Sequence, residues 1–107
     1  MAAYYKAHFS VTSTTTETDF AGASDVDSII DVTLFGPANW GESVEFVLYA
    51  KRDPAASAAA RERVVLNGPM TLQWLKGVPL LDGWRISHKK LSSGSNPTVA
   101  IEIAGVQ

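Results

Sequence analysis

Two segments near the end of the sequence alternate strictly between apolar and polar residues, and this pattern constrains the fold more than any other feature. Residues 84–89 place tryptophan, isoleucine and histidine at every second position, and residues 98–104 do the same with valine and two isoleucines. Residues 92–97, with the sequence Ser-Ser-Gly-Ser-Asn-Pro, separate the two segments and favour a turn. A period of two is that of a β-strand with one buried face. The sequence therefore predicts two strands joined as an antiparallel β-hairpin.

Shorter segments of the same kind precede this pair. Alternating or apolar runs occupy residues 4–11, 29–35, 44–51, 63–66 and 70–75, and turns containing glycine or proline follow several of them. Short strands at this spacing are typical of two-layer β proteins. We therefore predict an all-β fold: a single antiparallel β-sandwich or a jelly-roll-like open barrel of about seven short strands.

Two segments do not follow the alternation. Residues 12–27 are rich in threonine, serine, glycine and aspartate, with Phe20 as the only large apolar residue, and we predict a long acidic surface loop there. Residues 53–63 begin with Asp53 and Pro54 and continue with several alanines. Aspartate can cap a helix, proline fits its first turn and alanine has the highest helix propensity. This segment therefore predicts a short helical connector.

The composition indicates one globular domain over residues 1–107. An apolar share of 46% and a charged share of 19% separate the chain from disordered and membrane proteins. Cysteine is absent, which excludes a disulfide, a thiolate nucleophile and a cysteine zinc site. The first residues do not resemble a signal peptide, and no apolar run approaches the roughly 20 residues that span a bilayer. We expect a protein that stays in the compartment where it is made and does not enter a membrane.

Charge is distributed unevenly along the chain, although the net charge is only −2. Up to residue 50 the only basic residue is Lys6, against seven acidic residues, whereas from residue 51 onward eight basic residues stand against four acidic ones. One explanation is that the two halves interleave in the sheets and pair across strands. The other is a polarised surface, which would favour head-to-tail contacts between copies.

No pattern of residues indicates catalysis. His8 lies on the polar face of its predicted strand, and His88 continues the apolar face of residues 84–88 at the end of its strand, so we expect both to be structural. Neither a nucleophile elbow nor a phosphate-binding loop nor a set of metal ligands at suitable spacing occurs. We expect a protein that is not an enzyme and has no cofactor or metal. Because the chain is acidic overall, we do not expect it to bind nucleic acid.

Trp40 lies in the turn at residues 36–41 rather than in an alternating segment. An exposed tryptophan beside an amide side chain is typical of carbohydrate-binding surfaces, and Asn39, Trp40 and Tyr49 would form such a site. Alternatively, Trp40 folds back as a lid on one end of the core.

Other residues are candidates for contact with a protein partner. Apolar residues close to the two chain ends could dock on a neighbour, and basic residues facing outward from the predicted hairpin could guide it. Together with Trp40, the candidate contact residues are Tyr4, Tyr5, Arg85, Lys89, Lys90 and Val106.

In residue pattern and strand spacing, residues 70–77, 80–87 and 98–104 resemble the final strands of small virion proteins of tailed bacteriophages. These are short, cysteine-free β-sandwiches that decorate or cement capsids or extend tail parts. The resemblance covers the C-terminal third of the chain and implies a non-enzymatic virion protein that acts as a homo-oligomer. It also implies a capsid or tail protein as partner and assembly in the host cytoplasm. A carbohydrate-binding module that uses Trp40 is the alternative function.

Overall fold

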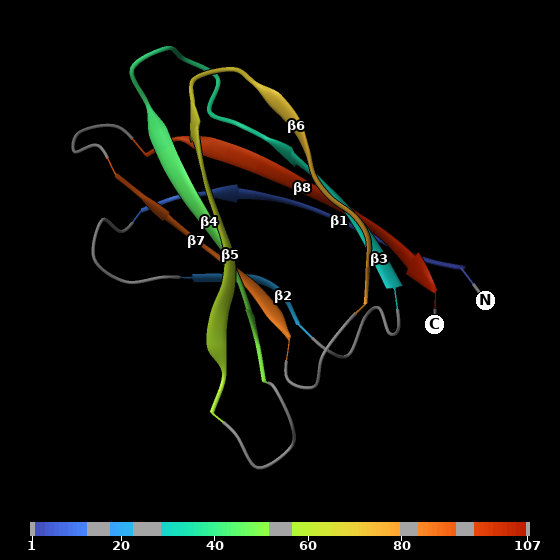
Figure 1. Cartoon of the computed structure of the whole chain (residues 1–107). Coiled ribbons are helices and arrows are strands. Elements are labelled where there is room, and N and C mark those ends of the chain that lie inside the picture. Colours follow the sequence, from blue (N-terminus) through green and yellow to red (C-terminus); the bar gives the residue numbers. More distant parts are fainter. Residues whose placement is uncertain are drawn as a thin grey trace.

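The computed structural model describes residues 2–12, 18–22, 29–51, 57–79, 84–91 and 96–106. These residues contain no helix and form eight strands in two four-stranded sheets, drawn in Figure 1. One sheet has the order β1-β8-β3-β6 and the other β2-β7-β4-β5, and all neighbouring strands are antiparallel. The strands are β1 (Ala2–Ser10), β2 (Thr18–Gly22), β3 (Ile29–Phe35), β4 (Ser43–Ala50), β5 (Ala59–Asn67), β6 (Thr71–Pro79), β7 (Arg85–Lys90) and β8 (Thr98–Val106).

The order of the strands is that of a jelly roll. Among the described strands, only β4 and β5 follow each other in the chain and also lie side by side in a sheet. Every other connection passes from one sheet to the opposite one, which is how a double-sheet jelly roll interleaves its two halves. The predicted all-β antiparallel fold is confirmed, as two packed sheets in jelly-roll order with eight described strands where about seven were expected.

The predicted hairpin of residues 84–104 is wrong in its pairing, although both of its strands exist. β7 lies between β2 and β4 in one sheet, whereas β8 lies between β1 and β3 in the other. The alternation of a strand reveals which of its faces is buried but not which strand lies beside it. The seven residues between Lys90 and Thr98 exceed the usual two to five of a hairpin loop, and the strands on either side of them belong to opposite sheets.

The core lies between the sheets and is made by the alternation seen in the sequence. Every second residue of β3, β4 and β8 points inward and is almost completely buried, and Phe46 of β4 is the largest side chain with no exposed surface. Burial of an apolar side chain of this size contributes roughly 1.5–3 kcal/mol. The main core residues are Ile30, Val32, Leu34, Val44, Phe46, Leu48, Leu66, Trp84, Ile86, Val99, Ile101 and Ile103.

The predicted surface loop at residues 12–27 is interrupted by a strand. β2, residues Thr18–Gly22, pairs with β7 and has a bulge between Asp19 and Ala21. β2 is an edge strand of its sheet, and only β7 supplies its backbone hydrogen bonds. Such a strand can form without a clear apolar alternation in its sequence, which is why the sequence did not reveal it. Residues 13–17 and 23–28 lie outside the described residues.

The predicted helical connector at residues 53–63 is also wrong where the structure describes it. Residues 59–63 belong to β5, in which Ala59 pairs with Ala50 and Glu62 with Leu48 of β4. The alanines have a high helix propensity but no apolar face to bury, and pairing with β4 satisfies the backbone instead. Residues 52–56 lie outside the described residues.

Among the described residues, ion pairs join the first half of the chain to the second, two through an acid of the first half and one through its single base, Lys6. Glu45 on β4 accepts a hydrogen bond from Arg63 on β5 at 3.3 Å and forms an ion pair with Lys89 on β7 at 3.8 Å. Lys6 on β1 lies 3.4 Å from Glu102 on β8. These pairs agree with the interleaved arrangement of the two halves. In the described part of the chain, no helix is long and apolar enough to span a membrane.

Candidate functional site

The loop that carries Trp40 connects β3 to β4 and lies against the turn between β5 and β6. The backbone N–H of Gly36 donates to the carbonyl oxygen of Met70 at 2.8 Å, and the N–H of Gly68 donates to that of Glu42 at 2.8 Å. Within the loop, the side-chain amide of Asn39 donates to the Glu42 carboxylate at 3.3 Å. These contacts hold the two turns together at one end of the sandwich.

The Trp40 side chain is 75% exposed, so it is not a lid on the core. Its ring nevertheless lies against the backbone of Gly68, where a Cβ atom would come within 2.5 Å of Trp40 Cε3. Gly68 has a φ of +79°, a conformation that favours glycine. The ring is therefore held from one side and open to solvent on the other. Met70, which is 43% exposed, follows Gly68 in the same turn and extends the apolar surface. We call Trp40 and Met70 the apolar tip.

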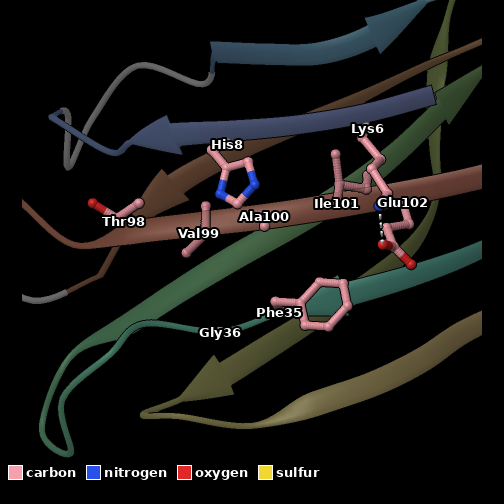
Figure 2. A pocket seen from close by; sticks show the side chains of 9 residues that line it. All are labelled: Lys6, His8, Phe35, Gly36, Thr98, Val99, Ala100, Ile101 and Glu102. Carbon is pink, nitrogen blue, oxygen red and sulfur yellow. Dashed lines mark ion pairs between the residues drawn. The ribbon is translucent and has the colours of Figure 1, made fainter.

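A second feature is a hollow of about 340 Å³ on the outer face of the β1-β8-β3 sheet. The register places Ala100 of β8 between His8 of β1 and Phe35 of β3. Figure 2 shows the two rings on either side of the short Ala100 side chain. The hollow exists because a small residue stands between two large ones on the face that points away from the core. We call it the Ala100 hollow.

The rim of the Ala100 hollow carries charge. The Lys6 ammonium and the Glu102 carboxylate form their ion pair in the next row of the sheet, as the dashed line in Figure 2 marks. Gly36 and Thr98 line the other end. The hollow is therefore apolar at its centre and charged at one end, which suits a single aromatic or aliphatic group with a polar neighbour.

Arg85 and Lys89, two predicted partner contacts, have partners within the chain. The Arg85 guanidinium lies 4.1 Å from the centroid of the Tyr49 ring and donates to the Ser87 hydroxyl at 2.8 Å. Lys89 pairs with Glu45. In the register of β4 and β7 these residues lie on either side of Val47, which faces away from the core yet is buried. Both basic side chains thus interact with neighbours on the outer face of their own sheet.

Lys90 was predicted to contact a partner, but the structure places it in the interior. It is buried, with 6% of its surface exposed, and its ammonium donates to the Asn96 side-chain oxygen at 2.8 Å. Lys90 shares the inner side of β7 with Ile86 and His88, and His88 is also buried rather than at a frayed strand end. The charge of lysine suggested an outward position, but the strand alternation places it inside at the end of the sandwich.

The predicted contact residues near the chain ends lie within paired strands. Tyr4 and Tyr5 of β1 pair with Ala104 and Ile103 of β8, and Val106 pairs with Ala2. The backbone at both ends of the described chain is thus part of the sheet. Contact of these three residues with a partner stays a prediction.

The predicted carbohydrate site is not assembled as a set of three. Trp40 and Asn39 precede β4, whereas Tyr49 is near its other end, roughly 20 Å away at about 3.3 Å per residue. Tyr49 also lies under Arg85. Only Asn39 and Trp40 are neighbours. The Ala100 hollow was not predicted because its members are distant in sequence, and only the outward position of the small Ala100 between Thr98 and Glu102 hints at it.

Comparisons with known proteins identify the fold. No family model and no curated protein matches the sequence. A solved structure does share the fold: a chain of the Bacillus endospore appendages, described as a novel family of disulfide-linked pili. The two chains are 10% identical, with a TM-score of 0.57, and the match covers 98% of this chain and 88% of the other. The likeness is therefore to a pilus protein rather than specifically to phage virion proteins.

Proposed function

We propose that this chain is a non-enzymatic structural subunit that assembles with copies of itself into an extracellular polymer. The observation that carries the proposal is the jelly roll that it shares, over almost its whole length, with a protein of the endospore appendage pili. A fold alone can host many functions, so the surface must also be suited to self-assembly.

The apolar tip provides such a surface. Trp40 is largely exposed and lies against Gly68, and the exposed Met70 stands two residues after Gly68 in the same turn. A tryptophan held in place at low entropic cost is a typical anchor of protein interfaces. Neighbouring exposed apolar residues at one end of a small domain often mark an interaction site.

The linkage between subunits would differ from that of the pilus protein. That family is described as disulfide-linked, whereas this sequence contains no cysteine. Polymers of this chain would therefore be held by noncovalent contacts, and they would dissociate on dilution with or without a reducing agent.

Capsid decoration or a tail accessory role is a narrower form of the same proposal. It would place the chain in a virion, with a capsid or tail protein as the supporting lattice. The pilus likeness favours self-assembly into a polymer over this narrower form.

Carbohydrate binding is the second candidate function, and the exposure of Trp40 beside Asn39 favours it. The remote position of Tyr49 leaves this site with one aromatic platform. A sugar stacked on Trp40 would shift its fluorescence, and no shift across a panel of glycans would remove this candidate.

Self-association is the direct test. Sedimentation velocity of the purified chain from low to high micromolar concentration should show species that grow with concentration, and electron microscopy should show elongated assemblies. Reducing agent should change neither result. A monomer at high micromolar concentration would overturn the proposal.

A further inference from the structure

The turn between β5 and β6 begins with a chemically labile pair of residues. Asn67 is the last residue of β5, and of Asn39, Asn67 and Asn96 only Asn67 is followed by a glycine. Asparagine is thermally labile because the backbone nitrogen of the next residue can attack its side-chain amide. Gly68 has no Cβ atom to hinder this approach. Asn67 is therefore the most labile asparagine of the sequence.

The fold restrains the residue that would attack. Asn67 is exposed to solvent, whereas Gly68 is buried. The N–H of Gly68 donates to the carbonyl oxygen of Glu42 at 2.8 Å, and the Trp40 ring lies against Gly68. The Gly68 nitrogen can attack only after it loses its proton, and the hydrogen bond to Glu42 opposes this loss. The loop of residues 36–42 thus holds the attacking group from two directions.

The residue that would be attacked is held by the start of β4. The Oδ1 atom of Asn67 accepts a hydrogen bond from the Ser43 hydroxyl at 2.5 Å, and Asn67 and Ser43 are paired in the β4–β5 ladder. Closure of a five-membered ring requires the side chain and the following peptide of Asn67 to rotate towards each other. Pairing with Ser43 opposes both rotations, so the turn must first open locally.

We propose that Asn67 and Gly68 form a self-modifying site, which the loop of residues 36–42 keeps inactive and which reacts when this loop leaves the turn. The Gly68 nitrogen gives up its proton and bonds to Cγ of Asn67, and the side-chain nitrogen leaves as ammonia. Water then opens the resulting succinimide at either carbonyl, which gives aspartate or isoaspartate at residue 67. Water is the only co-reactant, and the reaction does not depend on self-assembly.

The product would change the end of the sandwich that carries the apolar tip. Either product places a negative charge beside Ser43, and isoaspartate also adds one carbon atom to the backbone ahead of Gly68. A longer backbone displaces Gly68 from the position in which Trp40 packs on it. A departure of the loop that is followed by this reaction is therefore recorded in the covalent structure, and the return of the loop does not reverse it.

Peptide mapping by mass spectrometry measures the conversion after incubation at mildly alkaline pH. In the full chain unfolded in guanidinium chloride, Asn67 should convert before Asn39 and Asn96. In the folded chain, Asn67 should convert at least about 10-fold more slowly than in the unfolded one, because the reaction requires local opening. Equal rates in the two states would overturn the proposal, since the fold would then give no protection.

Two variants release the two restraints separately. W40A removes the ring from Gly68, and S43A removes the hydroxyl that holds Asn67. Each should raise the rate in the folded chain by roughly 5–30-fold, the factor expected for the loss of one such contact. Two matched controls should leave the rate unchanged: M70A, which shortens the other exposed side chain of the apolar tip, and S43T, which keeps the hydroxyl. Circular dichroism verifies that all four variants fold.

A core variant separates local opening of the turn from unfolding of the whole chain. Ile86 is buried on β7 and pairs with Leu48, towards the other end of β4 from Ser43. I86V removes one methylene from the core and so lowers global stability without touching the turn. The rate at Asn67 in folded I86V should equal that of the wild type. An acceleration by I86V as large as that by W40A and S43A, or no acceleration by either of these two, would overturn the proposed role of the loop.

Discussion

The Trp40 ring occupies the space into which a side chain of residue 68 would project. A Cβ atom on Gly68 would lie 2.5 Å from Trp40 Cε3, and the positive φ of Gly68 independently disfavours other residues. The most exposed large apolar side chain among the described residues thus depends on the absence of a side chain 28 positions further along the chain.

G68A should therefore destabilise the protein more than G41A. Gly41 has a φ of +91° but nothing within 4 Å of its Cβ position, so G41A reports the backbone cost alone, about 1–2 kcal/mol. G68A adds the displacement of the Trp40 ring. Urea denaturation measures both, and equal losses of unfolding free energy would show that the ring contact has no energetic role.

F46A should cost about 3–5 kcal/mol of unfolding free energy. Phe46 has no exposed surface and lies at the centre of the core, so its removal loses apolar burial and leaves a cavity. V65A removes two methyl groups from an exposed position and should change stability by less than about 0.5 kcal/mol. Thermal or urea unfolding of both variants checks the contrast.

E45Q should destabilise the protein by about 1 kcal/mol or less, and high salt should reduce the loss. Glu45 is shared by Arg63 and Lys89, and its removal leaves two neighbouring basic side chains without their common acid. At about 1 M salt the interaction is screened within about 3 Å. E102Q removes one more exposed ion pair, that with Lys6, and should lower the unfolding free energy by less than E45Q does. A loss that grows with salt would contradict this view.

K90M and N96A should differ although they remove the same hydrogen bond. Methionine fills the buried position of Lys90 without a charge, and Asn96 is exposed and can bind water instead, so K90M should change stability by less than about 1 kcal/mol. N96A deprives a buried ammonium of an acceptor and should cost about 1–3 kcal/mol. Urea unfolding distinguishes the two, and a larger loss for K90M would indicate that the ammonium itself stabilises the fold.

The sequence predicted burial far better than it predicted neighbours. Ile86 and Ile101 were both expected to face the core, and both do, but from opposite sheets. A period of two depends only on the chain's own geometry, whereas the choice of neighbouring strand depends on all the others.

The same limit explains what was missed elsewhere. Ala59 and Ala60 favour a helix locally, yet β4 offers them paired hydrogen bonds. The hollow at the outward-facing Ala100 could not be predicted, because it depends on the register that places Ala100 between residues 8 and 35, more than 60 positions earlier in the chain. Lys90 was misplaced because residue type was given more weight than the alternation that it continues.

The strand order also determines when the Ala100 hollow can exist. Among the described strands, β1 has β8 as its only neighbour, so the first strand is locked in place only by the last. His8, Phe35 and Ala100 come from β1, β3 and β8, so the hollow they form requires all three strands to be paired. Non-local pairings of this kind form slowly. A chain in which β1 has not yet paired with β8 would therefore lack this hollow, although its other strands could already be in place.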